Sequence, residues 1–326
     1  MASKKAALFW IFLIAMAFSV AWYTQGNDLD LDSKWETEDL AALKYQKLDQ
    51  DSKNELLYKA VDHNNTDLVR LLLENGANIN AKNKQRKTPP FKTGERTSVN
   101  KASEKLLLIA AEKNNFEMAK LLLENGANVN FVPHDCSQKR RGCYNMPLWE
   151  AIQNNNFEMA KYFIENGAIF KNKGWKKMEG WKPLEFAITQ RNLPILQLLI
   201  DNGANANAEE YVLKYHNGMQ STFKVTILYT AVNYENIEAM RLLIRKGANV
   251  NAEILDGAKT ILQEAVNQGN SEAVKILVEN GANRWAESRN GKTASDIAFA
   301  RRGSYLDKDY GKYEKILHIL EPNRFW

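Results

Sequence analysis

The phrase Leu71-Leu72-Leu73-Glu74-Asn75-Gly76-Ala77-Asn78-Ile79-Asn80 decides the fold, because almost the same ten residues return at positions 121–130. The Gly-Ala pair at its centre occurs four more times in the same context, with its glycine at positions 167, 203, 247 and 281. The stretch before the phrase is duplicated as well, since Asn-Asn-Phe-Glu-Met-Ala-Lys stands at both 114–120 and 155–161. Self-similarity at spacings of a few tens of residues indicates a repeat architecture.

Each unit predicts two short helices. Residues 106–111 are an apolar cluster that suits a first helix, and Asn114 follows, a residue type that tolerates a left-handed turn. Residues 116–123 then place apolar side chains at helical spacing. Gly126 is expected to end the second helix, because the residue just past a helix often needs positive φ. Such a pair cannot bury its apolar face alone, so stacked units are expected.

These units resemble the ankyrin-repeat family, whose pattern joins a Thr-Pro-Leu-His helix start to a later Leu-Leu and Gly-Ala. Versions of that start stand at residues 146–151 (Met-Pro-Leu-Trp-Glu-Ala), 182–187 (Lys-Pro-Leu-Glu-Phe-Ala), 226–231 (Thr-Ile-Leu-Tyr-Thr-Ala) and 260–265 (Thr-Ile-Leu-Gln-Glu-Ala). None of the four keeps the histidine, so the hydrogen bonding usual at that helix start lacks its residue. The resemblance implies an all-α repeat solenoid of about seven repeats over residues 51–326, with a binding function and no catalysis.

The N-terminal segment predicts export. Lys4 and Lys5 precede an apolar run from residue 6 to residue 18, as in the first two regions of a signal peptide. Cleavage after Ala21 would make residues 1–21 a signal peptide, whereas residues 6–23 are also long enough for a retained membrane anchor. In both cases the lysines stay in the cytoplasm, and the repeats lie outside it, in the periplasm, secreted, or tethered by a single span. Residues 22–50 are expected to form an acidic linker and an N-capping helix.

The spacing between repeats exceeds the family period. The six glycines are 50, 41, 36, 44 and 34 residues apart, against a period of about 33. Each surplus falls between a Gly-Ala phrase and the next first helix, where ankyrin proteins carry a finger-like hairpin beside a concave surface. The insertions therefore predict extended hairpin finger loops, either as binding elaborations or as loop growth that costs little.

The predicted fingers are basic and aromatic. Basic groups among aromatic rings suit an anionic ligand, such as a lipid headgroup, an acidic glycan or an acidic protein face; solvated basic loops with packed tryptophans are the alternative. The candidate partner-binding residues are Lys84, Arg86, Lys87, Phe91, Lys139, Arg140, Arg141, Trp175, Lys176, Lys177, Trp181, Tyr211 and Tyr215.

Two cysteines, Cys136 and Cys143, both fall in the second insertion. In an oxidising compartment a disulfide between them is the simplest expectation. A metal site with His134 and Asp135 is the alternative, although the cysteine spacing does not match a Cys-x-x-Cys knuckle.

No motif for catalysis, a cofactor or a metal is present, so none of these is expected. The histidines occupy unrelated repeat positions, and the net charge of +5 is mild. Asparagine is frequent throughout, and its frequency by itself predicts no chemistry. The sequence predicts a monomeric scaffold for a protein partner, with an anionic membrane or glycan surface and a host-directed role as alternatives. A location outside the cytoplasm argues against nucleic acid.

Overall fold

The computed structural model describes residues 45–81, 105–130, 147–169, 183–216, 219–254 and 257–323. The chain divides into two units, Met1–Leu48 and Asp49–Trp326. Only Tyr45–Leu48 of the first unit are described, so the architecture below is that of the second. Its described helices are α3 (Gln50–Asp62), α4 (Thr66–Glu74), α5 (Leu106–Glu112), α6 (Phe116–Glu124), α7 (Pro147–Gln153), α8 (Phe157–Glu165), α9 (Pro183–Thr189), α10 (Leu193–Asp201), α11 (Ile227–Asn233), α12 (Ile237–Arg245), α13 (Ile261–Gln268), α14 (Ser271–Glu279), α15 (Ala294–Arg302) and α16 (Tyr310–Leu320).

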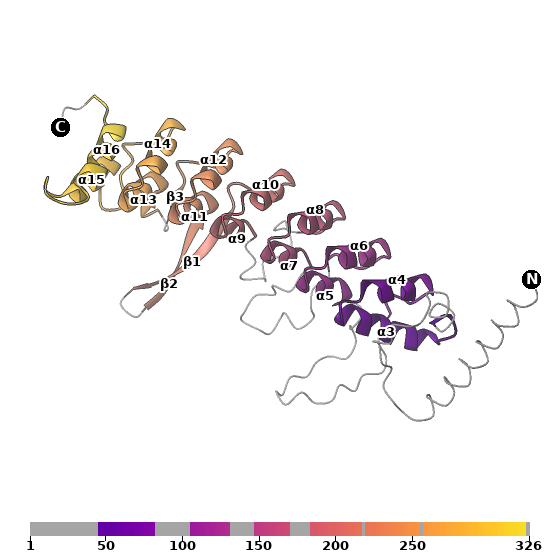
Figure 1. The fold of residues 1–326 in the computed structure, drawn as a ribbon. Helices are drawn as coiled ribbons and strands as arrows, with labels where there is room; N and C mark the ends of the chain where they lie inside the picture. The colour runs from indigo at the N-terminus through magenta and orange to yellow at the C-terminus, as the bar shows by residue number, and fades with distance from the viewer. Residues whose placement is uncertain are drawn as a thin grey trace, which may run out of the picture. The chain divides into compact units, whose positions relative to one another are not determined.

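Within the described ranges these helices form seven consecutive helix–turn–helix pairs, and this number agrees with the predicted number of repeats. First helices contact first helices of the neighbouring pairs, as in α5 against α3 and α7, and second helices contact second helices, as in α6 against α4 and α8. Figure 1 shows the pairs side by side in chain order. The prediction of a helical repeat solenoid is confirmed.

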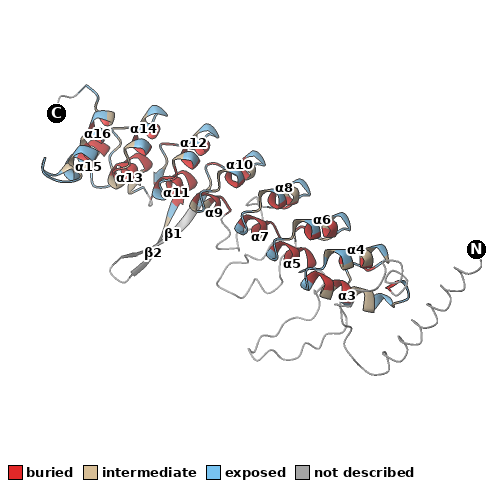
Figure 2. Ribbon diagram, in the orientation of Figure 1, coloured by how far each residue is buried: buried red, intermediate tan, exposed pale blue. Residues whose placement is uncertain are grey.

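The core runs between the two rows of helices (Figure 2). An alanine recurs in every first helix and is no more than 1% exposed, which lets neighbouring first helices approach closely. Its copies are Ala60, Ala110, Ala151, Ala187, Ala231, Ala265 and Ala298. The second helices supply larger side chains, of which Phe163 in α8 is fully buried. Each pair therefore buries its apolar face only because neighbours cover it.

The turn residues behave as the sequence predicts. Asn114 has a φ of 55°, in the left-handed region, and lies between the first and second helix of its repeat. Gly126 follows the second helix with a φ of 88°, and its amide donates to the Leu123 carbonyl. The other five glycines of the repeated phrase also have positive φ.

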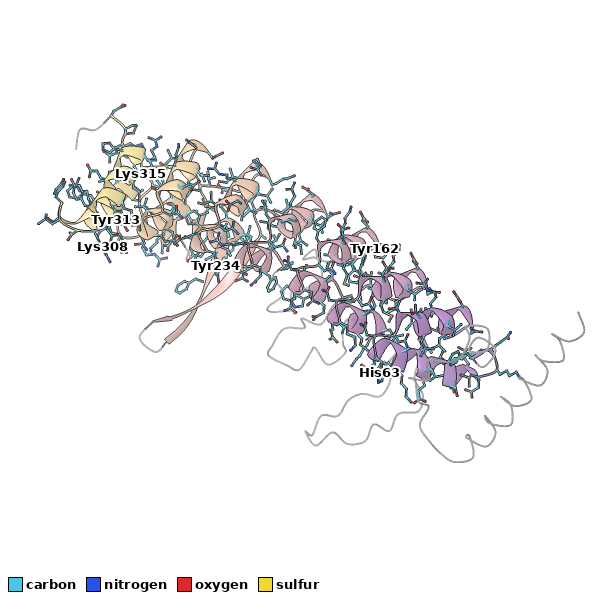
Figure 3. All side chains as sticks on the ribbon, viewed as in Figure 1. His63, Tyr162, Tyr234, Lys308, Tyr313 and Lys315 are labelled. Carbon is cyan, nitrogen blue, oxygen red and sulfur yellow. The ribbon has the colours of Figure 1, made fainter. Side chains whose placement is uncertain are left out.

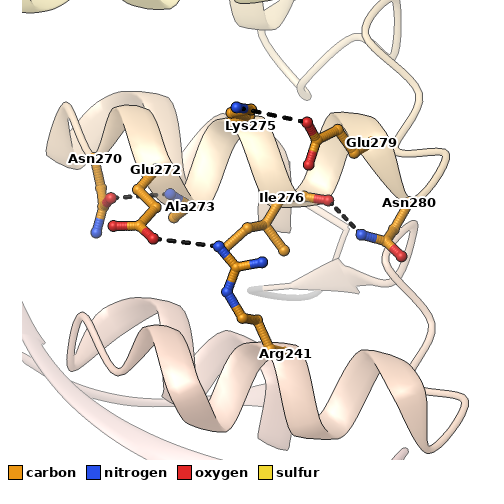
Figure 4. Close-up of polar contacts among 8 residues, drawn as sticks. All are labelled: Arg241, Asn270, Glu272, Ala273, Lys275, Ile276, Glu279 and Asn280. Carbon is orange, nitrogen blue, oxygen red and sulfur yellow. Dashed lines mark hydrogen bonds and ion pairs between the residues drawn. The ribbon is translucent and has the colours of Figure 1, made fainter.

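The recurring asparagines have a structural role in the repeats. The residue before six of the second helices is an asparagine whose Oδ1 accepts the amide of the third residue on, as Asn115 does from Met118 at 2.9 Å. In four of them the Nδ2 group also donates to the preceding repeat, as that of Asn115 does to Asn64 at 2.8 Å. Figure 4 shows the capping bond of Asn270 beside the ion pair of Arg241 with Glu272, which joins α12 to α14.

A second asparagine ladder follows the Gly-Ala phrase. Asn130 donates to the Gly167 carbonyl at 2.9 Å and accepts the Ile169 amide at 2.7 Å, so one side chain bridges two repeats. Asn207 and Asn251 make the equivalent pairs of bonds to their following repeats. These amides satisfy turn groups that a helix end leaves without partners.

The first helix of the array begins at Gln50. Its first turns carry Gln50, whose Nε2 donates to the Gly76 carbonyl, and Asn54, whose Oδ1 accepts the Asn78 amide. These two side chains together occupy the place that one ladder asparagine takes in later repeats. The first repeat is therefore capped from within its own helix.

The helix starts without the family's histidine are bonded in another way. Thr226 and Thr260 each accept an amide three residues on, and Gln263 completes a capping box at the start of α13. Gln263 stands where the pattern has its histidine, and its Nε2 donates to the carbonyls of Ala286 at 2.7 Å and Lys292 at 3.0 Å. A different residue type thus ties the helix to the next linking segment.

Two linking segments contain antiparallel hairpins. Strands β1 (Glu209–His216) and β2 (Met219–Thr226) pair from Glu209 opposite Thr226 to His216 opposite Met219. The shorter strands β3 (Glu253–Ile254) and β4 (Lys259–Thr260) form the other hairpin. β2 contacts the first helix α11, β4 contacts the first helix α13, and β2 also contacts β3. Both hairpins therefore lie on the side of the first helices (Figure 1).

Candidate functional site

The first helices present a row of side chains that differ from repeat to repeat. We call this row the first-helix face. It consists of Lys59, Ile109, Glu150 and Phe186, which are half-buried, together with Asp62, Glu112, Gln153, Thr189 and Asn233 one helical turn further on. The alanine next to the first of these positions is constant, whereas the neighbouring outward residue is basic, apolar, acidic or aromatic. Packing explains the constant position. The position before it is half-buried in α3, α5, α7 and α9, whereas in α11 and α13 it holds the buried Thr230 and Glu264.

A cavity of about 430 Å³ opens between α3 and α5. Its lining residues are Tyr58, Asp62, Lys105, Leu108, Ile109, Glu112 and Lys113. Leu108 is only 3% exposed, so the cavity has an apolar wall, while two acidic and two basic groups supply charge. A cavity of this size, with an apolar wall and charged groups around it, suits a polar side chain of a bound partner.

The carboxyl groups of Glu112 and Glu150 come from neighbouring first helices, α5 and α7. Partial burial raises the pKa of Glu150 to about 7, and the charge of Glu112 adds to the shift. Partial burial also raises the pKa of Glu112, although Lys105 and Lys113 oppose that shift. Stacking two helices thus places the half-buried Glu150 near the more exposed Glu112, where a cationic group of a partner would be favoured.

Replacing Glu150 by glutamine is expected to stabilise the protein above neutral pH. A raised folded-state pKa means that the unfolded chain ionises first, so the carboxyl group lowers stability increasingly from pH 4.5 to about 7. After allowance for its partial exposure, we expect Glu150→Gln to add about 1 kcal/mol at pH 8 and almost nothing at pH 4. Urea unfolding at both pH values measures the difference.

The exposed Glu158 of the same repeat is the matched control. Glu158→Gln should change stability by less than about 0.5 kcal/mol at either pH. An equal gain for Glu150→Gln at pH 4 and pH 8 would contradict the ionisation argument.

Aromatic and ionic contacts organise the middle of the face. The rings of Trp149 and Phe186 meet edge to face at 5.1 Å, which joins α7 to α9. Further along, Lys259 Nζ lies 3.1 Å from Glu264 Oε2, whose side chain is 10% exposed. Burial raises the pKa of Tyr229, and the negative charge of Glu264 contributes. Two first helices and a hairpin thus share one polar cluster.

Most residues that the sequence singles out lie outside the described ranges. They are Lys84, Arg86, Lys87, Phe91, Lys139, Arg140, Arg141, Trp175, Lys176, Lys177 and Trp181, together with Cys136 and Cys143 of the predicted disulfide and the segments 1–21 and 22–44. The backbones of Tyr211 and Tyr215 are described, in β1 opposite Lys224 and Gln220. Both tyrosines thus belong to the hairpin beside the first-helix face.

Glu112, Glu150 and the cavity were not predicted from the sequence to be part of a binding site. The sequence does place the two glutamates at outward positions of neighbouring first helices. When the two helices are aligned on their constant alanines, these positions are three residues apart. Their partial burial depends on how α5 and α7 stack, and no local pattern reports that distance. Figure 3 labels His63 and Tyr234, which follow the first helices α3 and α11 and are exposed.

The described ranges hold neither a cluster of metal-ligand side chains nor a membrane-spanning helix. There, no three His, Cys, Asp or Glu side chains come together as metal ligands would. Among the helices described, none combines the length and the hydrophobicity needed to cross a bilayer.

A family model described as ankyrin repeats (3 copies) matches residues 39–132, 107–210 and 210–288. No curated protein matches the sequence.

Solved structures share the fold. The ankyrin repeat domain of human ASB11 aligns with a TM-score of 0.50 and 21% identity, covering 83% of this chain and 98% of that one. An ankyrin repeat domain from Acinetobacter baumannii AYE gives 0.50 and 24%, covering 67% and 96%. The ankyrin repeat domain of Bcl-3, a member of the IkappaB family, gives 0.53 and 19%, covering 81% and 97%. At these identities the likeness concerns the fold alone.

Proposed function

The chain belongs to the ankyrin-repeat family, and from this premise we propose that it holds a partner protein outside the cytoplasm, on the first-helix face and the hairpins beside it. Ankyrin-repeat domains are non-enzymatic scaffolds for protein–protein interaction, and this chain is therefore a binding protein rather than an enzyme. The repeats supply a rigid row of neighbouring helices, so specificity comes from the side chains that vary along that row.

One observation carries the choice of surface. The outward position of the first helices changes from Lys59 to Ile109, Glu150 and Phe186, while the adjacent alanine stays constant and buried. A position that only filled space would repeat with the array. The cavity between α3 and α5 and the acidic pair of α5 and α7 add shape and charge to the same surface. A partner that places a cationic side chain among Glu112 and Glu150 and an apolar one near Phe186 would fit it.

A photocrosslinking residue at position 186 tests both whether the partner binds to the first-helix face and whether it does so outside the cytoplasm. In native cells, we expect a discrete crosslinked product that is recovered outside the cytoplasm, because Phe186 lies on the proposed contact row. The matched control is position 197, where Gln197 is exposed on α10, the second helix of the same repeat. Equal crosslinking from both positions would contradict the surface, and a product confined to the cytoplasm would contradict the location.

The salt dependence of binding separates this proposal from its alternatives. Binding through the mixed apolar and polar first-helix face should change little with ionic strength. Binding of an anionic lipid or glycan by the basic insertions should weaken steeply as salt rises, because exposed charges are screened. An envelope role of that kind and a host-directed role remain predictions from sequence, since the basic insertions lie outside the described residues.

A further inference from the structure

The last repeat departs from the others in its inter-helix connection. Seven residues, 303–309, join α15 to α16, whereas two or three residues join the helices of the other described pairs. We call residues 303–309 the terminal loop. In this loop Leu306 is 90% exposed to solvent and Tyr305 is 79% exposed. Phe299, which lies a few residues earlier on α15, is 56% exposed. Isolated exposed apolar residues are ordinary, but three of them in one short stretch mark an interaction surface.

Internal contacts order the terminal loop. Asp307 Oδ2 accepts the Ser304 amide at 2.6 Å, and the Asp307 amide donates back to the Ser304 carbonyl at 2.9 Å. Gly303 has a φ of 66° and a ψ of −151°, a region that is essentially open only to glycine, and a Cβ there would overlap the Asp307 carboxylate. The exposed side chains are thus presented by a closed turn.

Aromatic stacking continues the same arrangement. The Arg302 guanidinium lies 4.9 Å from the Phe299 ring and 5.2 Å from the Tyr310 ring, and Tyr310 meets Tyr305 edge to face at 5.2 Å. Arg302 Nη1 also lies 2.9 Å from Glu314 Oε2. This anchor fixes Tyr305 before any ligand arrives, which reduces the entropy lost on binding.

Residues 299–315 carry five cations and three carboxylates, and the acidic residues Asp296 and Glu321 flank this stretch. Arg302 and Glu314 compensate each other. The remaining groups are the cations Arg301, Lys308, Lys312 and Lys315 and the carboxylates of Asp307 and Asp309. Of these cations, Lys312 donates to the Gln268 carbonyl, which leaves its charge uncompensated. Figure 3 labels Lys308 and Lys315 at the same end of the array. Apart from the Arg302–Glu314 pair, four cations and two carboxylates lie within this stretch, and the Asp307 carboxylate is engaged with the Ser304 amide.

From this combination we propose that the terminal loop is a contact for an anionic lipid surface, with Tyr305 and Leu306 entering the interface and the surrounding cations meeting the headgroups. Two adjacent apolar side chains on a turn offer too little area for a stable protein interface, which needs roughly 800 Å² from each partner. A bilayer interface needs no complementary pocket, and its binding strength adds apolar burial to attraction of basic residues. The contact does not depend on the first-helix face and lies in a different part of the repeat.

An environment-sensitive fluorophore on the loop tests the proposal directly. The full chain carries Leu306→Cys, labelled with a nitrobenzoxadiazole group, in a background of Cys136→Ser and Cys143→Ser. Vesicles of phosphatidylcholine containing roughly 30% phosphatidylserine should shift its emission to the blue, whereas pure phosphatidylcholine should do so far less. Adding Lys308→Ala should lower the partition coefficient about fivefold, the loss expected for one basic residue near a membrane.

The matched control carries the label at Asp67→Cys, an exposed position on α4. It separates entry of the terminal loop from membrane attachment by the N-terminal apolar segment, which would bring both labelled proteins to the vesicles. Unchanged emission at position 306, or equal shifts at positions 306 and 67, would overturn the proposal. A shift that depends on protein concentration and needs no vesicles would overturn it in favour of a second copy of the chain.

Discussion

Replacing Phe163 by alanine is expected to lower the free energy of unfolding by about 3–5 kcal/mol, the largest effect of any single substitution considered for this protein. Phe163 is fully buried in α8, and this helix packs against α6, α7 and α10. Because repeats contact only their neighbours, a cavity in the third of seven pairs weakens two interfaces at once. Urea unfolding followed by circular dichroism should show the loss and a broader transition, as the two ends of the array unfold separately.

Two further variants make this result interpretable. Phe163→Leu keeps most of the buried volume and should cost less than about 1.5 kcal/mol. Ile169→Ala removes a side chain of the same repeat that is 52% exposed, and it should fall within about 0.5 kcal/mol of the parent. Similar losses for Phe163→Ala and Ile169→Ala would contradict the packing described for α8.

Asn236→Ala should produce the second-largest effect, a loss of about 2–4 kcal/mol. The Asn236 side chain is 5% exposed. It accepts the Ala239 amide at 3.1 Å and donates to the Ile188 carbonyl at 2.9 Å, across the boundary between two repeats. The alanine variant would leave the Ala239 amide buried without a partner, which costs more than the hydrogen bond itself contributes. The Ile188 carbonyl would lose its bond across the repeat boundary and keep only the Arg191 amide, 3.1 Å away. Hydrogen exchange of the Ala239 amide, with urea unfolding, measures the local and the global loss.

Asn65 provides the comparison, because it caps α4 in the same way but is exposed. Asn65→Ala should cost about 1 kcal/mol, the ordinary value for a lost helix cap. If both variants lost the same stability, the bond from Asn236 to Ile188 would add nothing, and the ladder would serve only as a set of caps.

The partners of the ladder asparagines could not be predicted from the sequence. Repetition of Asn115 and Asn130 in the sequence reveals that these positions are structural, yet their partners lie 51 and 37 residues away, at Asn64 and Gly167. A local reading assigns Asn115 to a turn, and the turn is correct. The bond to the preceding repeat exists only when the two repeats stack in one register.

The sequence predicted on which side of the array the candidate site lies, but it did not predict which residues form the site. The surplus residues between repeats indicate the edge where linking segments lie, and the β1–β2 hairpin occupies that edge beside α11. The predicted basic and aromatic residues of the other insertions remain predictions. Glu112 and Glu150 were missed because the partial burial of Glu150 and its proximity to Glu112 result from the packing of α5 on α7, which the spacing of residues in the chain does not report.

Sequence alone therefore determined the repeat, its number, the alternation of first and second helices and the glycines that end the second helices. These follow from local rules of periodicity and backbone conformation, which act within about ten residues. Tertiary structure decided the inter-repeat hydrogen bonds, the cavity between α3 and α5, the raised pKa of Glu150 and the order of the terminal loop around Arg302. Each of these depends on distances between residues that only stacking brings together, and the free energy of a contact is set by distance and hydration rather than by position in the chain.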